Sequence, residues 1–258
     1  MMWFKVLVLI LLIGGLIMPH GLPDFGTTTP KETIFGQVDI GELAVRLGSI
    51  VSYDRRGDVF YLENFTNGIN QWTFTQAGGS GAISLSNERF LYSGISAKIT
   101  VGVGAGSWSY ISRDFPLPVY SRIGMELALA FDNEITVIEL GMRVFDGATE
   151  HEYRVQYWTN TFDLKLLVGG VWTTIANAPC YYTDETQFHH IKLVGDFKTD
   201  SHVRLLFNEN GYDISSYAIT MSPSVSLQTA RYEIYLYSDD ALTRYAWLDH
   251  IILTQNEP

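Results

Sequence analysis

The chain has 258 residues, of which 47% are hydrophobic, 14% aromatic and 17% charged, and its formal net charge is -11. Intrinsic disorder needs low hydrophobicity and a high fraction of charge, so this composition predicts a folded protein with a sizeable core. The length suits one main domain, because all-β sandwiches reach this size as a single unit. With 17 Lys and Arg against 28 Asp and Glu, the chain would repel phosphate backbones, which argues against nucleic acid as a partner.

The chain opens with the pattern of a membrane signal in residues 1–18. Residues 6–18 read VLVLILLIGGLIM and follow a single cation, Lys5. This run is shorter than the roughly 20 apolar residues that span a bilayer comfortably, which favours a signal peptide over a membrane anchor. No A-x-A cleavage pattern follows, so an uncleaved anchor stays open as the alternative. In both cases we expect the rest of the chain to be extracellular or at the cell surface, with membrane contact only through this segment.

Two short regions connect this segment to the main domain. Residues 19–35 are rich in proline and threonine and are typical of a linker. Residues 36–57 contain the stretch GELAVRLG (41–48), which places three apolar side chains on one helical face before a final glycine. We therefore expect a short helix and a connecting arm in residues 36–57.

Residues 58–258 have the pattern of an all-β domain. Short segments rich in Val, Ile, Tyr, Phe, Trp and Thr are separated by Gly, Asn and Asp, which predicts about thirteen strands. Residues 191–197 alternate between apolar and polar side chains, as a half-buried strand requires. Residues 231–237 alternate too, but their polar face also carries tyrosines, so both faces of this strand are suited to contacts.

Glycine-containing pairs predict tight turns between these strands. The sequence has an Asp-Gly pair at 146–147, a Gly-Gly pair at 169–170 and an Asn-Gly pair at 210–211. Such pairs tolerate the positive φ of hairpin turns. Hairpins that follow one another without helical segments imply two antiparallel sheets packed face to face.

Four stretches are similar to parts of one group of known domains. YLENFTNGINQW (61–72) is similar to their opening strand, LYSGISAKIT (91–100) to a strand that a glycine introduces, and AWLDHIILT (246–254) to their closing strand. Between them, FHHIKLVGDFKTDSHVRLLFNENGYDIS (188–216) is similar to a hairpin with an Asn-Gly turn. In this order they resemble the jelly-roll domains of the concanavalin A-like, laminin-G and carbohydrate-binding-module group. The resemblance implies an all-β, two-sheet antiparallel jelly-roll sandwich, preceded by the hydrophobic segment, the linker and the short helix.

The same resemblance implies a structural calcium site. Many carbohydrate-binding modules of this shape hold calcium with acidic groups from the first and last strands, and the matching positions are Glu63 and Asp249. Calcium takes about six to eight oxygens, so backbone carbonyls or Asn64 would complete the site. The alternative is that Asp249 pairs with Arg244, and His250 stands where these families often have a second Asp. No cofactor is required otherwise.

The sequence lacks the patterns of a catalytic site. Hydrolases of this fold carry closely spaced carboxylates on one strand, as in E-x-D-x-E, and no such pattern occurs. Glu150 and Glu152 share a face but follow a turn, and we interpret them as solvated; Glu134 and Glu139 face opposite sides. The only cysteine, Cys180, lacks the signature of a nucleophile and is interpreted as a packed thiol. We therefore predict that the protein is not an enzyme.

The aromatic residues are the remaining candidates for a binding site. Of two adjacent residues in a strand one faces outward, so the pairs at 157–158 and 181–182 each expose a planar ring. Exposed rings stack on the apolar faces of sugars, whereas the alternative is that they form a subunit interface or cover a sheet. The candidate platform residues are Trp108, Tyr110, Trp158, Trp172, Tyr181 and Tyr182.

Three functions are compatible with these patterns. The first is an exported, non-catalytic β-sandwich module that acts in carbohydrate binding or surface assembly, with carbohydrate or other copies of itself as its partner. The alternative is a structural component of a virion or filament, such as a capsid, decoration or tail-associated protein, whose jelly roll makes the subunit contacts. A glycan-active hydrolase ranks third, because the sequence contains no catalytic motif.

Overall fold

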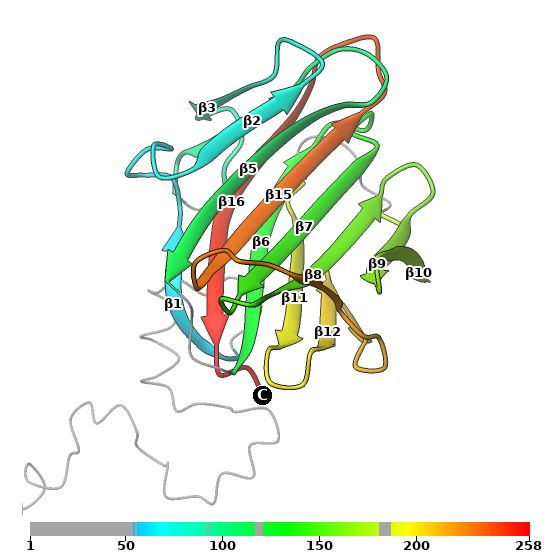
Figure 1. Cartoon of the computed structure of the whole chain (residues 1–258). Helices are drawn as coiled ribbons and strands as arrows, with labels where there is room; N and C mark the ends of the chain where they lie inside the picture. Colours follow the sequence, from blue (N-terminus) through cyan, green and yellow to red (C-terminus); the bar gives the residue numbers. More distant parts are fainter. Residues whose placement is uncertain (1–53, 55, 92, 117–120, 181–186) are drawn as a thin grey trace, which may run out of the picture. The chain divides into compact units, whose positions relative to one another are not determined.

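The structure is a computed structural model that describes residues 54, 56–91, 93–116, 121–180 and 187–258 (Figure 1). Every regular element in these residues is a β-strand, so the all-β prediction is confirmed for this part of the chain. The predicted signal or anchor, linker and short helix lie outside the described residues. Among the residues that are described, no helix is long and apolar enough to cross a membrane.

Within the described ranges, sixteen strands form two antiparallel sheets. The sequence predicted about thirteen strands, because the shortest edge segments lack a clear pattern. In the first sheet β1 (Asp58–Glu63) pairs with β16 beside a path of seven strands. The path runs β13 (Asn210–Asp213), β12 (Ser201–Phe207), β11 (His189–Asp196), β6 (Arg122–Phe131), β16 (Arg244–Gln255), β4 (Ser96–Val101) and β3 (Ala82–Ser86).

The second sheet faces the viewer in Figure 1. In this sheet β14 (Thr220–Pro223) pairs with β8 beside the main path. The path runs β10 (Val171–Asn177), β9 (Asp163–Val168), β8 (Thr149–Trp158), β7 (Val137–Phe145), β15 (Thr229–Ser238), β5 (Ser107–Pro116) and β2 (Thr73–Ala77).

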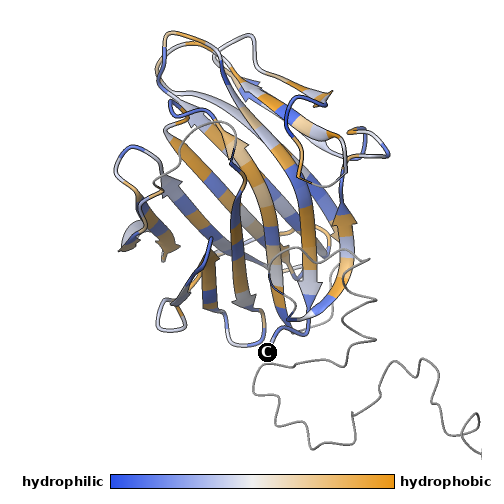
Figure 2. Ribbon diagram, turned by 180° about the vertical axis from the view of Figure 1, so that it is seen from behind, coloured by the Kyte–Doolittle hydropathy of each residue, from blue (hydrophilic) through white to orange (hydrophobic). Residues whose placement is uncertain are grey.

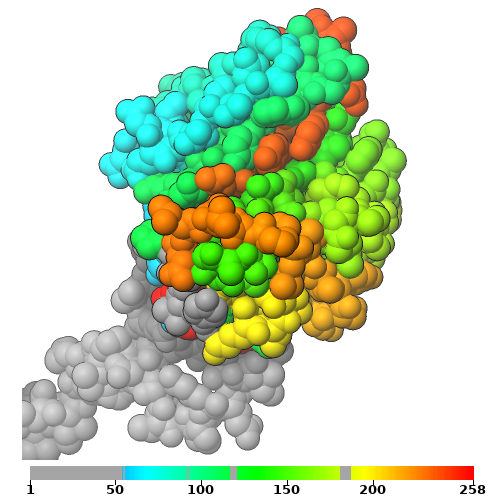
Figure 3. Space-filling view, viewed as in Figure 1, coloured from blue at the N-terminus to red at the C-terminus, as the bar shows by residue number. Residues whose placement is uncertain are grey.

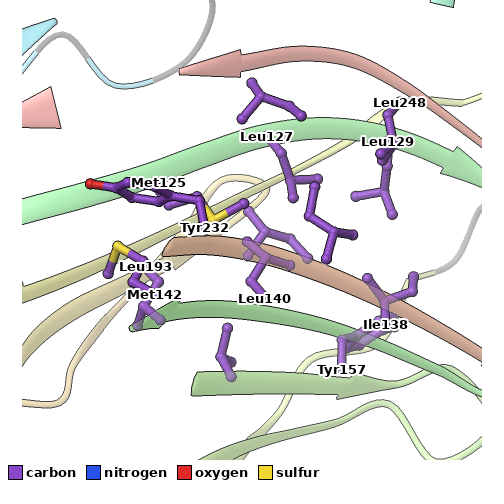
Figure 4. Close-up of a cluster of buried hydrophobic side chains, with 14 of the residues drawn as sticks. Met125, Leu127, Leu129, Ile138, Leu140, Met142, Tyr157, Leu193, Tyr232 and Leu248 are labelled. Atoms are coloured by element: carbon purple, nitrogen blue, oxygen red, sulfur yellow. The ribbon is translucent and has the colours of Figure 1, made fainter. Parts of the chain in front are cut away.

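The core lies between the two sheets and follows from alternation along the strands. Bands of apolar and polar residues alternate along the ribbons in Figure 2. Figure 4 shows Leu127 of β6 in the first sheet close to Leu140 of β7 and Tyr232 of β15 in the second, and all three are fully buried. Burying such a side chain contributes about 1.5–3 kcal/mol, so the layer between the sheets is the main source of stability.

One glycine lets the two sheets approach closely. A Cβ at Gly195 of β11 would lie 2.2 Å from Cδ1 of Tyr153 in β8, so only glycine leaves room for the ring. The Tyr153 hydroxyl then donates a hydrogen bond to the Asp196 carbonyl oxygen at 3.2 Å. Sheet-to-sheet packing at this end of the sandwich therefore depends on one missing methyl group.

Two of the three predicted turns are confirmed and one is wrong. Gly147 (φ +100) lies between β7 and β8, and Gly169 and Gly170 (φ +56 and +84) lie between β9 and β10. The Asn-Gly pair at 210–211 instead begins β13, because Phe207 pairs with Asn210 and leaves residues 208–209 as the turn. Asn208 takes the left-handed conformation there (φ +50), which asparagine tolerates better than most residues.

A charged cluster holds both ends of the described chain to the outer face of the first sheet. Lys192 of β11 is 0% exposed, and its Nζ lies 2.9 Å from Asp54 Oδ2 and 2.7 Å from Glu257 Oε1. Arg204 of β12 also pairs with Glu257. Although burial alone would raise it, hydrogen bonds and charges from Arg56 and Lys192 lower the pKa of Asp54 to about 2. Asp54 therefore stays ionised at neutral pH.

Candidate functional site

The outer face of the second sheet carries a group of neighbouring aromatic side chains, here called the aromatic band: Trp108, Tyr110, Tyr235 and Tyr237. Trp108 and Tyr110 alternate with inward residues on β5, and the two other tyrosines do so on β15, next to it. Ring centroids of Tyr110 and Tyr235 lie 4.3 Å apart, and those of Tyr235 and Tyr237 are stacked at 6.0 Å. All four side chains are partly exposed, so the band presents ring surface to solvent.

Two buried carboxylates lie beside the band and share one arginine. Glu139 of β7 and Glu233 of β15 are 2% and 1% exposed, although their backbone positions face outward. Arg154 of β8 donates from Nη2 to Glu233 Oε2 at 2.6 Å and from Nη1 to Glu139. Gln156 Nε2 donates to the second oxygen of Glu139 at 2.6 Å. The guanidinium therefore donates hydrogen bonds to both carboxylates and offsets part of the cost of burying their charges.

These carboxylates also fix the tyrosines of the band. Tyr110 donates its hydroxyl proton to Glu233 Oε1 at 2.9 Å, and Tyr237 donates to Glu139 Oε2 at 3.4 Å. Burial first, and then the neighbouring glutamates, raise the pKa of both hydroxyls well above the ordinary value. Both tyrosines are therefore protonated donors at any physiological pH.

A glycine in β7 makes room for this arrangement. Gly141 lies opposite Glu233 in the register of β7 and β15 and opposite Arg154 in that of β7 and β8. A Cβ there would approach Glu233 Oε2 to 3.3 Å and Arg154 Cγ to 3.5 Å. The missing side chain thus leaves the space in which the ion pair forms.

Further glutamates extend the network toward β14. Arg143 Nε lies 3.4 Å from Glu150 Oε1, 3.2 Å from Glu152 Oε1 and 3.2 Å from Glu233 Oε2. The prediction that Glu150 and Glu152 share a face is confirmed, but their interpretation as solvated residues is wrong, because both are ion-paired. Four glutamates and two arginines form this charged network, which therefore has an excess of negative charge: Glu139, Glu150, Glu152, Glu233, Arg143 and Arg154.

The structure places four of the six predicted platform residues on this outer face. Trp108 and Tyr110 belong to the aromatic band, whereas Trp172 on β10 lies opposite Leu167 of β9, away from it. Trp158 lies at the end of β8, where Lys165 Nζ is 3.8 Å from its ring centroid and occupies one ring face. The remaining two, Tyr181 and Tyr182, are outside the described residues.

The two residues of the predicted calcium site do not come together. Glu63 lies opposite the core residue Ile251 and accepts hydrogen bonds from Trp72 Nε1 at 3.1 Å and the Phe65 amide at 2.9 Å. Asp249 lies on the outer face of the first sheet, where it accepts from the Leu91 amide at 2.6 Å.

Neither of these residues belongs to a metal-binding group in the described part of the chain. No cluster of three or more His, Cys, Asp or Glu side chains there could hold a metal ion. Arg244, which the sequence offered as a partner for Asp249, pairs with Asp240 and Glu134. A calcium ion shared by Glu63 and Asp249 stays a prediction.

The predicted packed thiol is buried between the sheets. Cys180 is 5% exposed, and its Sγ lies 3.3 Å from His189 Nδ1. Burial raises the pKa of the thiol, and hydrogen bonds from Tyr157 and Asn208 offset part of this rise. The protonated thiol is thus favoured, which does not suit a nucleophile.

Comparison with solved structures identifies the architecture. The endo-β-1,4-glucuronan lyase from the fungus Trichoderma reesei superposes with a TM-score of 0.53 at 10% identity, over 77% of this chain and 96% of that one. The fold is a jelly-roll β-sandwich. This confirms the fold that the resemblance to the concanavalin A-like and carbohydrate-binding-module group implied, and at this identity the likeness concerns the fold alone.

Other solved structures resemble the sandwich more distantly. Carbohydrate-binding modules from the β-sandwich superfamily give a TM-score of 0.44 at 13% identity, over 78% of this chain and 64% of theirs. A Bacillus licheniformis β-glucanase gives 0.44 at 10% identity, over 76% of this chain and 97% of that one. No protein-family model and no curated protein matches the sequence.

Proposed function

We propose that the protein binds carbohydrate on the outer face of its second sheet and does not catalyse a reaction there. The observation that carries this proposal is the aromatic band, whose partly exposed rings are held in place by buried carboxylates. Rigid planar rings with polar groups beside them suit sugars, because a sugar ring has an apolar face and hydroxyl groups around its rim.

The register of the strands gives the site an extended shape. Trp108 lies opposite Tyr237, which lies opposite Val137, which in turn lies opposite Trp158. Neighbouring strands are about 4.8 Å apart, so this row is ~14 Å long and offers room for several consecutive sugar rings. Figure 3 views the molecule from this side, with β2, β5, β15, β7 and β8 following one another across the face. The proposed ligand is therefore an oligosaccharide or a polysaccharide chain.

The hydrogen bonds of the carboxylates support binding rather than catalysis. A glycoside hydrolase needs one protonated carboxylic acid as a proton donor. Burial raises the pKa of Glu233, which by itself would suit such an acid, but the positive charges of Arg154 and Arg143 oppose this rise. Its oxygens accept from Tyr110 and Arg154, so this residue serves as an acceptor and its role here is to position other groups.

Binding to a panel of oligosaccharides tests the proposal. We expect Trp108→Ala and Tyr235→Ala to weaken binding by about tenfold or more, ~1.4 kcal/mol, because each removes a stacking surface. Tyr245→Ala is the matched control, since Tyr245 is a partly exposed aromatic residue on β16 of the other sheet. Isothermal titration of the full chain measures all three. Absence of binding by the unmodified protein, or an equal loss in the control, would overturn the proposal.

Export to the extracellular or cell-surface space, assembly with other copies and a place in a virion remain predictions of the sequence. Cell fractionation and light scattering test the first two.

A further inference from the structure

We infer that the aromatic band takes an uncharged carbohydrate, one whose contacted rings carry hydroxyl groups rather than carboxylate or sulfate groups. The inference rests on the proposed function and names the ligand class of that same site. Two independent features of the face support it: the sign of its charge and the direction of its hydrogen bonds.

The first feature is the excess of negative charge beside the band. In the charged network four glutamates face two arginines, and each arginine is already paired with more than one glutamate. The charges of Arg231 and Asp114, at the border of the face, cancel in a two-bond pair of 2.6 and 3.0 Å. An anionic sugar on the band would therefore be repelled.

The second feature is that two tyrosine hydroxyl protons are already used in hydrogen bonds within the protein. Tyr110 and Tyr237 donate their hydroxyl protons to Glu233 and Glu139, so toward a ligand their hydroxyl oxygens can only accept. A sugar hydroxyl can donate to such an oxygen. A carboxylate or sulfate cannot, because it offers acceptors only. The face thus matches hydroxyl groups and leaves an acidic substituent without a donor at these two positions.

One positively charged side chain on this face, Lys165, would attract an acidic sugar rather than repel it. Lys165 of β9 lies over the Trp158 ring, with its Nζ 3.8 Å from the ring centroid. It is three strands away from Tyr235 in the sheet order, at the far border of the face. If an acidic glycan bound at all, Lys165 is the place where its charge would be accommodated, so Lys165→Met serves as a diagnostic variant.

The test compares neutral oligosaccharides with their acidic counterparts. The probes are β-1,4-linked gluco-, manno- and galacto-hexaoses and the same hexaoses oxidised at C6 to uronates, titrated into the full chain. We expect the oxidised form of whichever hexaose binds best to bind about tenfold more weakly at about 10 mM salt. This gap should narrow at about 1 M salt, since the Debye length falls from ~30 Å to ~3 Å.

A charge variant separates electrostatics from shape. Glu150→Gln combined with Glu152→Gln removes two negative charges from the charged network on the same face. We expect this variant to narrow the difference in affinity between the neutral and the oxidised probe at low salt. Glu88→Gln combined with Glu209→Gln removes the same charge from exposed positions outside this face and should leave the gap unchanged. Melting temperatures of both variants verify that they fold.

The outcomes distinguish the inference from the proposed function. If no hexaose of either kind binds, both are overturned. If the oxidised hexaose binds as tightly as the neutral one or more tightly, the site binds carbohydrate but the inference is wrong, and loss of that binding in Lys165→Met locates the acidic group. The inference is supported if the neutral hexaose binds more tightly than the oxidised one, and if this difference in affinity shrinks in the Glu150→Gln, Glu152→Gln variant but not in the Glu88→Gln, Glu209→Gln variant.

Discussion

At the scale of single residues, Arg154 connects the two buried carboxylates of the candidate site. It compensates Glu139 and Glu233 together, and through them it holds the hydroxyls of Tyr110 and Tyr237. Removing one partner of a buried ion pair leaves an uncompensated charge, which is far more costly than removing the whole group.

We therefore expect Arg154→Met to lower the free energy of unfolding by about 3–5 kcal/mol and to weaken carbohydrate binding. Denaturant titration and binding assays measure the two effects. Arg231→Met is the control, because Arg231 forms a more exposed pair with Asp114, and such pairs contribute at most about 1 kcal/mol. Equal losses in the two variants would show that Arg154 is not the centre of the network.

A buried histidine predicts sensitivity to mild acid. His202 of β12 is 0% exposed between the sheets, and burial lowers its pKa from 6.5 to about 4, opposed only in part by its hydrogen bond to the Leu167 carbonyl. Between these values the unfolded chain binds a proton that the folded protein does not. The contribution of neutral His202 to the free energy of unfolding is thus fully present above pH 6.5 and is lost as the pH falls toward 4.

The loss amounts to at most about 1.4 kcal/mol for each pH unit. We expect His202→Leu to reduce the slope of unfolding free energy against pH in this window, as measured by urea titration at several pH values. His190, whose pKa burial also lowers to about 4, adds a slope of the same sign that the variant retains. Asp54 contributes only in more acidic solution, because its pKa is about 2. An unchanged slope in the variant would contradict the assignment to His202.

Alternation predicted which residues of the site point outward, but not which of them meet. Trp108, Tyr110 and the tyrosines of residues 231–237 were recognisable because outward aromatic residues stand out in an alternating strand. The ion pair between Arg154 and Glu233 was not recognisable from the sequence, since the two residues are 79 positions apart. Only the register of β15 against β7 and of β7 against β8 brings them together, and a register between distant strands leaves no local signal.

At the scale of elements, the contact between β8 and β11 depends on Gly195. An alanine there would place its methyl carbon 2.2 Å from the Tyr153 ring. We expect Gly195→Ala to lower the melting temperature and to cost about 1–3 kcal/mol, because the ring or the strand must move. Gly211→Ala is the control: its methyl would meet only the flexible end of Leu206 at 3.3 Å. If the melting temperature of Gly195→Ala were unchanged, the sheets would be able to separate locally to make room for the methyl group, which would contradict the prediction.

The misplaced turn between β12 and β13 shows how turn signals mislead. The Asn-Gly pair at 210–211 has the composition of a hairpin turn, yet Asn208 and Glu209 form it. Asn208 Oδ1 accepts from the His190 amide at 3.0 Å, so a contact with β11 anchors the turn two residues earlier. Local composition favoured one position, and a contact with a neighbouring strand selected another.

At the scale of the whole molecule, the two-sheet architecture followed from composition and alternation, whereas the order of strands did not. β1 and β16 come from opposite ends of the described chain, yet Asp58 pairs with Gln255. Similar strands could be exchanged within a sheet without changing any alternation pattern. The order is set by which pairs bury their surfaces together, and such contacts are long-range.

The charged cluster around Lys192 has a practical consequence for attaching the protein to a surface. Arg204 Nη1 donates to the Pro258 carbonyl oxygen at 2.8 Å, so the last residue lies on the side of the first sheet. A flexible tether joined there would leave the aromatic band pointing into solution. Coupling through amines would act differently. Lys192 is inaccessible to reagents, whereas Lys165 is partly exposed beside Trp158 and would carry the label onto the outer face of the second sheet.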